Sequence, residues 1–250
     1  MNFTQNKFTP FITSQKYPLL ITLVFFLVVC YVGFSYHNYW IVDQDGIHLL
    51  NGGEQIISGD WQNVHFVTTP TTAAIFYAIL NSVFNDGFTL MKLISIISGS
   101  ATVLIVFFII KNVSNYKTAL IGQLLFAFNP WFSFFSMQAE IDVLAVLLVC
   151  ASLYFATKKN LKPSDMIIMG SLLGASFMIR YQCIIIVITI IIFLLIRNKK
   201  IHINLSYVGL VVLLFLIVAS PLFIYNYSTV GNISDASGNF AMQFGSKYQT

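Results

Sequence analysis

Long runs of consecutive apolar residues alternate with short polar segments along most of the chain. The runs cover residues 17–35, 90–110, 119–135, 141–156, 166–179, 181–196 and 205–225. A helix of about 20 predominantly apolar residues crosses the hydrocarbon core of a bilayer, and continuous rather than alternating runs exclude a membrane β-barrel. The pattern therefore predicts an all-α polytopic membrane protein with about seven transmembrane helices.

The segment between the first two runs, residues 36–88, has a different pattern and contains no lysine or arginine. Apolar residues recur at a helical period within residues 46–58: Ile47, Leu50, Ile56 and Ile57. Residues 71–84 form a second helix-like piece of about 14 residues, which is short for a span. We expect two amphipathic helices along the membrane interface. In the alternative, residues 71–84 cross the membrane and every later span is inverted.

The basic residues decide between these alternatives. If residues 71–84 do not cross and the N-terminus is cytoplasmic, ten of the 13 basic residues fall at cytoplasmic span ends: Lys7, Lys16, Lys111, Lys117, Lys158, Lys159, Lys162, Arg197, Lys199 and Lys200. Such a bias favours the cytoplasmic side. We therefore expect a cytoplasmic segment at 1–16, a transmembrane module at 17–225 with an extracytoplasmic loop at 36–88, and an extracytoplasmic segment at 226–250.

Composition agrees with a membrane protein and narrows the partners. Hydrophobic residues make up 57% of the 250 and charged residues 9%, with a mean hydropathy of +0.80, whereas soluble proteins are about a quarter charged. The net charge of +4 does not indicate nucleic acid, because the basic residues lie between spans rather than in one patch. Cys30, Cys150 and Cys183 stand alone in apolar runs, which is typical of small packing residues.

Polar residues that could take part in catalysis or binding fall at span ends on the predicted extracytoplasmic side. They are Asp43, Asp45, His48, His65, Glu140, Asp142 and Arg180. Ionisable groups at a membrane edge are candidates for function. These come from the first loop, the start of the fourth span and the junction of the fifth and sixth, so a folded bundle can gather them in one cavity.

Most of these residues also have a purely structural interpretation. Asp45 suits the N-cap of the helix that follows it, and Glu140 and Asp142 suit a helix N-terminus. Arg180 can extend its head toward the interface from the tip of a helical hairpin. His48 and His65, together with Asp142, are candidate metal ligands, although two lone histidines are typical of ordinary polar surface.

The order of motifs resembles the GT-C glycosyltransferases, in particular the branch of protein O-mannosyltransferases and aminoarabinose transferases. The matching parts are Asp45, the helix at 47–58, Gly59-Asp60-Trp61, Phe128-Asn129-Pro130, Glu140-Ile141-Asp142, Arg180, and residues 221–227 with Gly231-Asn232. Two features depart from the family pattern. Gly46 stands where an acid usually follows the catalytic aspartate, and Thr68-Thr69-Pro70 replaces a Lys-Pro sequence. The family chains are longer, so the resemblance implies an N-terminal half in which 226–250 lead into a further C-terminal part.

The resemblance implies an enzyme that moves a sugar from a polyprenyl-phosphate donor to an extracytoplasmic acceptor, a protein, lipid or glycan, with inversion. The acceptor hydroxyl must lose a proton, and an ionised carboxylate is a suitable base; Asp45 is the first choice and Asp43 the second. Arg180 suits the lipid phosphate. Asp142, Glu140 and His65 are the further substrate-binding candidates, and the spans supply an apolar groove for the prenyl chain.

Several matters stay open at this level. A divalent metal ion is neither required nor excluded, with His48, His65 and Asp142 as its candidate ligands. A lipid or small-solute transport protein is an alternative, but it requires ionisable groups near the bilayer midplane, and the mid-span regions are nearly free of charge. A non-catalytic GT-C-like subunit is the third interpretation. All three predict a multi-pass protein of the plasma membrane or an equivalent of the endoplasmic reticulum, in contact with membrane lipid.

Overall fold

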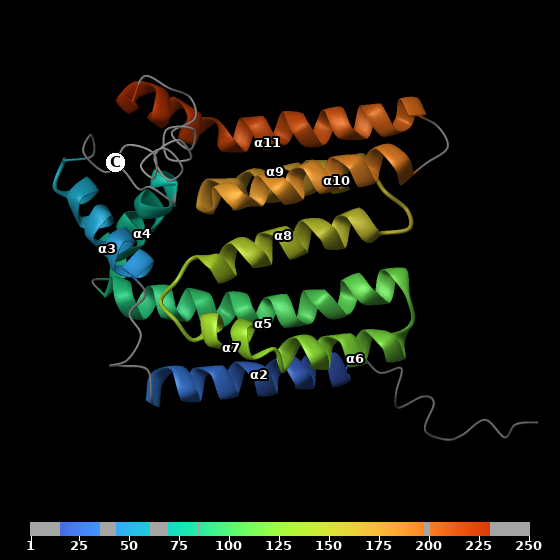
Figure 1. Ribbon diagram of the computed structural model, residues 1–250, viewed down its shortest axis with the longest axis horizontal. Helices are drawn as coiled ribbons and strands as arrows, with labels where there is room; N and C mark the ends of the chain where they lie inside the picture. The colour runs from blue at the N-terminus through green and yellow to red at the C-terminus, as the bar shows by residue number, and fades with distance from the viewer. Residues whose placement is uncertain (1–15, 36–43, 61–69, 85, 198–200, 231–250) are drawn as a thin grey trace, which may run out of the picture.

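The computed structural model describes residues 16–35, 44–60, 70–84, 86–197 and 201–230. Nearly all of these residues are helical, and no strand occurs among them. Most of the helices run roughly parallel and form one stack (Figure 1): α2 (Lys16–Ser35), α5 (Gly87–Val113), α6 (Tyr116–Ala127), α8 (Asp142–Thr157), α9 (Pro163–Ile179), α10 (Ile184–Arg197) and α11 (Ile201–Val230). The predicted all-α membrane fold is confirmed.

Three described helices are long and apolar enough to cross a membrane. They are α2, α5 and the part of α11 from Leu205 to Ser228. The α6 helix and α7 (Pro130–Ser136) count as a fourth span if the two are taken together. The apolar helices α8, α9 and α10 are shorter than a full span, so the count of seven stays a prediction for them.

The apolar run at 119–135 forms two helices, α6 and α7, whose axes differ in direction by 64°. The break falls at Asn129-Pro130, where proline lacks an N–H and disfavours helical conformation in the residue before it. Asn129 instead caps α7, with its side-chain oxygen 3.0 Å from the Phe132 amide.

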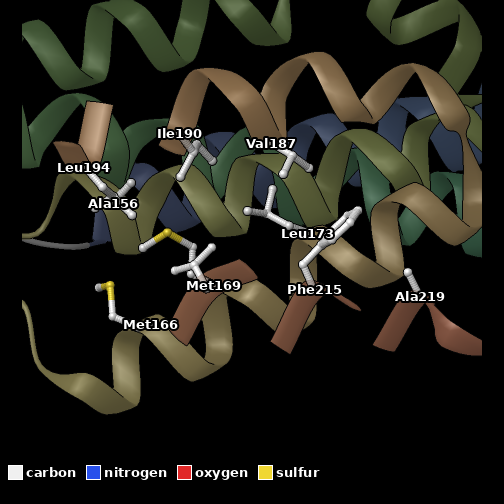
Figure 2. Packing of buried hydrophobic residues seen from close by; sticks show 10 residues of the cluster. Ala156, Met166, Met169, Leu173, Val187, Ile190, Leu194, Phe215 and Ala219 are labelled. Atoms are coloured by element: carbon white, nitrogen blue, oxygen red, sulfur yellow. The ribbon is translucent and has the colours of Figure 1, made fainter. Parts of the chain in front are cut away.

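The helices α9 and α11 approach closely through glycine. A Cβ added at Gly170 would lie 2.5 Å from the Val211 carbonyl oxygen, and one at Gly174 would lie 2.8 Å from the Val218 Cβ. Small residues let membrane helices approach in this way. Beside this contact, Figure 2 shows the core that joins α9, α10 and α11, formed by buried side chains that include Met169, Leu173, Val187, Ile190 and Phe215.

Two helices from the first loop lie across one end of the bundle (Figure 1): α3 (Gln44–Ile57) and α4 (Thr71–Phe84). Both predicted helices are confirmed. Thr72 ties α4 to α9 by donating a hydrogen bond to the Met178 carbonyl. Leu50 and Ile56 of the predicted apolar face pack against the buried cluster that contains Leu49, whereas Ile57 is 54% exposed.

Glycines also contribute to the face of α3 that packs against α4. A Cβ at Gly53 would lie only 3.4 Å from the backbone of Ala78, so α3 rests on α4 through its glycine-containing face. Counting apolar side chains misses such a face, because glycine contributes contact area without a side chain.

Candidate active site

An ion pair joins the start of α8 to the end of α9. Arg180 caps α9, and its Nε donates to Oδ1 of Asp142 in the first turn of α8. The arginine side chain is 11% exposed, whereas the aspartate side chain is 41% exposed. Asp142 is therefore the partner that keeps contact with solvent.

The structure tests two of the structural interpretations drawn from the sequence. Asp142 lies in the first turn of α8, as the interpretation as a helix N-terminus expects, but the N-cap is Ile141 and no side-chain cap hydrogen bond forms there. Arg180 is buried against Asp142 and does not extend to the surface. The sequence places these residues correctly at helix ends, but only packing brings α8 and α9 together.

A cavity of about 780 Å³ lies beside the ion pair. Its polar lining comes from Asp142, Arg180 and Gln182, and the rest of its wall is mostly apolar: Phe132, Phe135, Val143, Ala145, Val146, Val149, Cys183 and Ile186. The cavity thus has a charged region and a long apolar wall. Such a site suits a ligand with one anionic group and one hydrocarbon portion.

Glu140 stands just before α8 and is 1% exposed. Ser95 of α5 donates a hydrogen bond from its Oγ to the Glu140 carbonyl oxygen, so α5 fixes the backbone at this position. The candidate Glu140 is therefore held inside the protein near the Asp142–Arg180 pair, two residues before Asp142 in the chain.

The first turn of α3 lies against the same segment. A Cβ added at Gly46 would collide with the Ala139 carbonyl oxygen and would approach the Met91 side chain to 3.9 Å. This contact explains the departure from the family pattern, because the position after Asp45 has no room for a side chain. It also brings the backbone next to Asp45 up to the residue that precedes Glu140.

The remaining candidates are only partly placed. Asp45 belongs to the first turn of α3, but its side chain lies outside the described part of the structure. Asp43 and His65 lie wholly outside the described residues. His48 is exposed on α3. Among the residues that the structure describes, no three His, Cys, Asp or Glu side chains lie close enough to hold a metal ion. Metal binding by His48, His65 and Asp142 stays a prediction.

Sequence reasoning missed one buried cation, Lys92 of α5. Its side chain is 2% exposed, and its Nζ lies 5.2 Å from the centroid of the Phe34 ring and 5.9 Å from that of Phe88. Within the described ranges its Nζ has no hydrogen-bond partner. The signal was present in the sequence as a single lysine inside an apolar run.

The described helices and candidate spans define an all-α, polytopic membrane protein with a cavity at one end of its bundle. Residues 68–225, more than half of the chain, match the family described as dolichyl-phosphate-mannose-protein mannosyltransferase. The chain therefore belongs to the dolichyl-phosphate-mannose-protein mannosyltransferase family. The matched region contains Glu140, Asp142 and Arg180, whereas Asp43, Asp45, His48 and His65 precede it.

A solved structure shows the same fold. The chain is similar to the S. cerevisiae protein O-mannosyltransferase Pmt1-Pmt2 complex bound to the sugar donor, with a TM-score of 0.64 and 16% sequence identity. The similarity covers 90% of this chain and 35% of that chain, so this chain spans about a third of that relative's length. No curated protein sequence matches significantly.

Proposed function

We propose that the protein is a mannosyltransferase that uses a polyprenyl-phosphate-linked mannose as its donor. The observation that carries this proposal is the cavity beside Arg180, which combines a cationic group with a long apolar wall. A polyprenyl phosphate has the complementary chemistry, since one end is anionic and the rest is hydrocarbon. Membership of the mannosyltransferase family supports mannose as the sugar.

In this proposal Arg180 binds the phosphate of the donor. Guanidinium presents N–H groups in a planar fork that matches phosphate oxygens. Its present partner, Asp142, is 41% exposed, so water can solvate this carboxylate when a phosphate takes its place. The released Asp142 is then available to bind a hydroxyl group of the acceptor or of the sugar.

The transfer itself requires a base. The acceptor oxygen forms a bond to the anomeric carbon while the bond from that carbon to the phosphate oxygen breaks, and the acceptor proton must leave. We assign the role of the base that accepts this proton to Asp45, with Asp43 as the second choice. The reason is that the first turn of α3 lies against Ala139, beside Glu140. The negative charge then develops on the phosphate, next to Arg180. Glu140 and His65 remain candidates for substrate binding.

The proposed orientation places this site on the extracytoplasmic side of the membrane. Lys111, Lys158, Lys162 and Arg197 all lie at the other end of the bundle, where α5, α8 and α10 end and α9 begins. Such a bias favours a cytoplasmic location for that end. The proposed acceptor is a hydroxyl group of a protein on the extracytoplasmic side, and residues 17–225 form the proposed transfer module.

A transfer assay on membranes tests the proposal. Labelled polyprenyl-phosphate mannose is the donor, and label in protein is the product. We expect Asp45→Asn to lower transfer by a factor of about 100 or more, the usual contribution of a general base. Glu54→Gln is the matched control, because it removes an exposed carboxylate from the same helix. We expect it to retain transfer.

Three outcomes separate the interpretations. Full transfer by Asp45→Asn contradicts the assignment of the base. Donor binding without transfer by the wild-type protein favours the non-catalytic subunit. Absence of donor binding contradicts the proposal as a whole.

A further inference from the structure

A second cavity, of about 590 Å³, lies at the end of the bundle opposite the candidate active site. The helix α5 connects the two ends, since it begins at Gly87 beside α3 and α4 and ends at Val113 beside this cavity (Figure 1). The lining is polar and mostly basic: Lys111, Asn112, Lys158, Lys159, Asn160, Lys162, Ser164 and Asp165. None of these residues belongs to the proposed transfer site.

Hydrogen bonds between helices fix the floor of this cavity. Asn112 of α5 donates from Nδ2 to Thr157 Oγ1 at 3.2 Å and to the Tyr154 carbonyl oxygen at 3.4 Å. Both acceptors belong to α8. The ends of α5 and α8 are therefore tied together at the point where the cavity opens.

The loop that connects α8 to α9 is fixed as well. Arg197 of α10 donates to the carbonyl oxygens of Ala156, Lys158 and Lys159. Asp165 accepts the Lys162 amide at 2.9 Å and the Lys158 Nζ at 2.8 Å. Because both sides of the loop are held, its lysines project from an ordered backbone.

The charge of the cavity is unbalanced. Four lysines line it against one carboxylate, and that carboxylate, Asp165, already pairs with Lys158. Within the part of the chain that the structure describes, Lys111, Lys159 and Lys162 form no ion pair. Lys111 Nζ lies 5.8 Å from the centroid of the Phe107 ring and 5.9 Å from that of Tyr116, so aromatic faces hold its side chain in place.

We propose that this cavity binds a phosphate group, presented by the headgroup of an anionic membrane phospholipid. The position of the cavity selects the lipid as the source. It lies where the apolar lengths of α5 and α8 end, at Lys111 and Lys158, and the headgroup phosphates of a bilayer lie at the ends of its spans. A basic pocket between transmembrane helices is a recognised form of headgroup site.

Native mass spectrometry of the purified full chain tests this proposal. The protein is reconstituted in vesicles of phosphatidylglycerol and phosphatidylcholine, extracted, and examined for lipids that remain bound. We expect the wild type to retain phosphatidylglycerol in preference to phosphatidylcholine. The double variant Lys159→Gln, Lys162→Gln removes two exposed ammonium groups and should weaken retention roughly tenfold or more.

The control variant is Lys117→Gln, because Lys117 is exposed on α6 at the same end of the bundle but does not line the cavity. We expect it to retain phosphatidylglycerol as the wild type does. Equal losses in the control and the double variant would mean that only the general positive charge of this end attracts lipid, which overturns the proposal. So would equal retention in the wild type and the double variant.

A further arm separates the two sources of phosphate. Inorganic phosphate is added to the detergent-solubilised protein, and thermal stabilisation is measured in the wild type and the double variant. Stabilisation by inorganic phosphate without selective retention of phosphatidylglycerol would overturn the lipid as the source. Displacement of bound phosphatidylglycerol only at a large excess of inorganic phosphate supports it.

Discussion

Two arginines lie at opposite ends of the hairpin formed by α9 and α10, and they differ in what they bind. Arg180 pairs with Asp142, a carboxylate that is 41% exposed and borders a cavity. Arg197 donates to three backbone carbonyls at and after the end of α8. Carbonyl groups at a helix end have no partners within the helix, and a cation there satisfies them.

Arg180 can exchange its partner for another anion, whereas Arg197 cannot. The carboxylate that binds Arg180 can be solvated by water, so an anionic ligand can replace it. The carbonyls that bind Arg197 belong to the backbone and have no alternative donor within the described contacts of that loop. Arg180 is therefore suited to exchanging its carboxylate for another anion, whereas Arg197 holds the helix ends together.

Among the changes that test the comparison of the two arginines, Arg180→Gln is expected to have the largest effect, and this effect is on transfer. In the proposed site, loss of the guanidinium removes the charge opposite the donor phosphate, and truncation of a buried charged partner costs about 2–5 kcal/mol, or roughly 30-fold or more in affinity. The Michaelis constant for the donor measures this effect. Arg180→Lys keeps the charge but not the planar fork and should recover part of the loss. Unchanged kinetics in both variants would contradict the role of Arg180.

The second effect, from Arg197→Gln, is on stability alone. Glutamine can satisfy only part of what the guanidinium binds at the part-buried carbonyls of Ala156 and Lys158, and a hydrogen bond from a charged group contributes about 1.5–3 kcal/mol. We expect a lower thermal unfolding temperature in detergent and unchanged transfer per folded molecule. A loss of transfer without a loss of stability would mean that the two ends of the hairpin are not as different as their contacts indicate.

A smaller effect is expected from Asp142→Asn. Because Arg180 is buried while Asp142 is 41% exposed, loss of the carboxylate leaves a buried guanidinium without this ion pair, so stability should also fall. Donor affinity should rise, because the phosphate no longer competes with a carboxylate for Arg180. Calorimetric titration with a polyprenyl phosphate measures the affinity. If the affinity instead falls, Asp142 contributes directly to donor binding and is not merely displaced.

The smallest effect depends on pH and belongs to Asp165. Burial alone would raise the pKa of this carboxyl, but hydrogen bonds from Lys158 and the Lys162 amide, with the charges of both lysines, hold its pKa below the ordinary value. Its stabilising contribution is therefore fully present above the unfolded pKa of about 3.9 and is lost as the pH falls through the lower folded pKa.

Thermal unfolding of Asp165→Asn across this pH range is the corresponding measurement. We expect the variant to be less stable than the wild type at neutral pH, and the difference to shrink as the medium becomes acidic. A difference that stays constant with pH would show that the hydrogen bonds of Asp165, rather than its charge, carry the stabilisation.

Local signals in the sequence predicted most of the helices. The segment 71–84 was predicted with the bounds that the structure shows, because Pro70 and a continuous apolar run define it. The junction of the hairpin at Arg180 was equally clear, since one arginine interrupts two apolar runs. The bend at Asn129-Pro130 is also encoded locally, because proline lacks the N–H that would continue the helix.

The candidate site was predicted as a set of residues but not as a set of contacts. The sequence determined that Glu140, Asp142 and Arg180 stand at helix ends, because hydropathy, capping and proline act over a few residues. It did not determine that Asp142 and Arg180, 38 residues apart, form an ion pair, or that Lys92 is buried.

Only the tertiary structure decided these pairings. Which ionisable groups meet depends on how closely the helices approach, and close approach depends on positions such as Gly46 and Gly170, where a backbone of another segment occupies the space of a side chain. That choice is a property of packed surfaces, which the periodicity of a single helix does not contain.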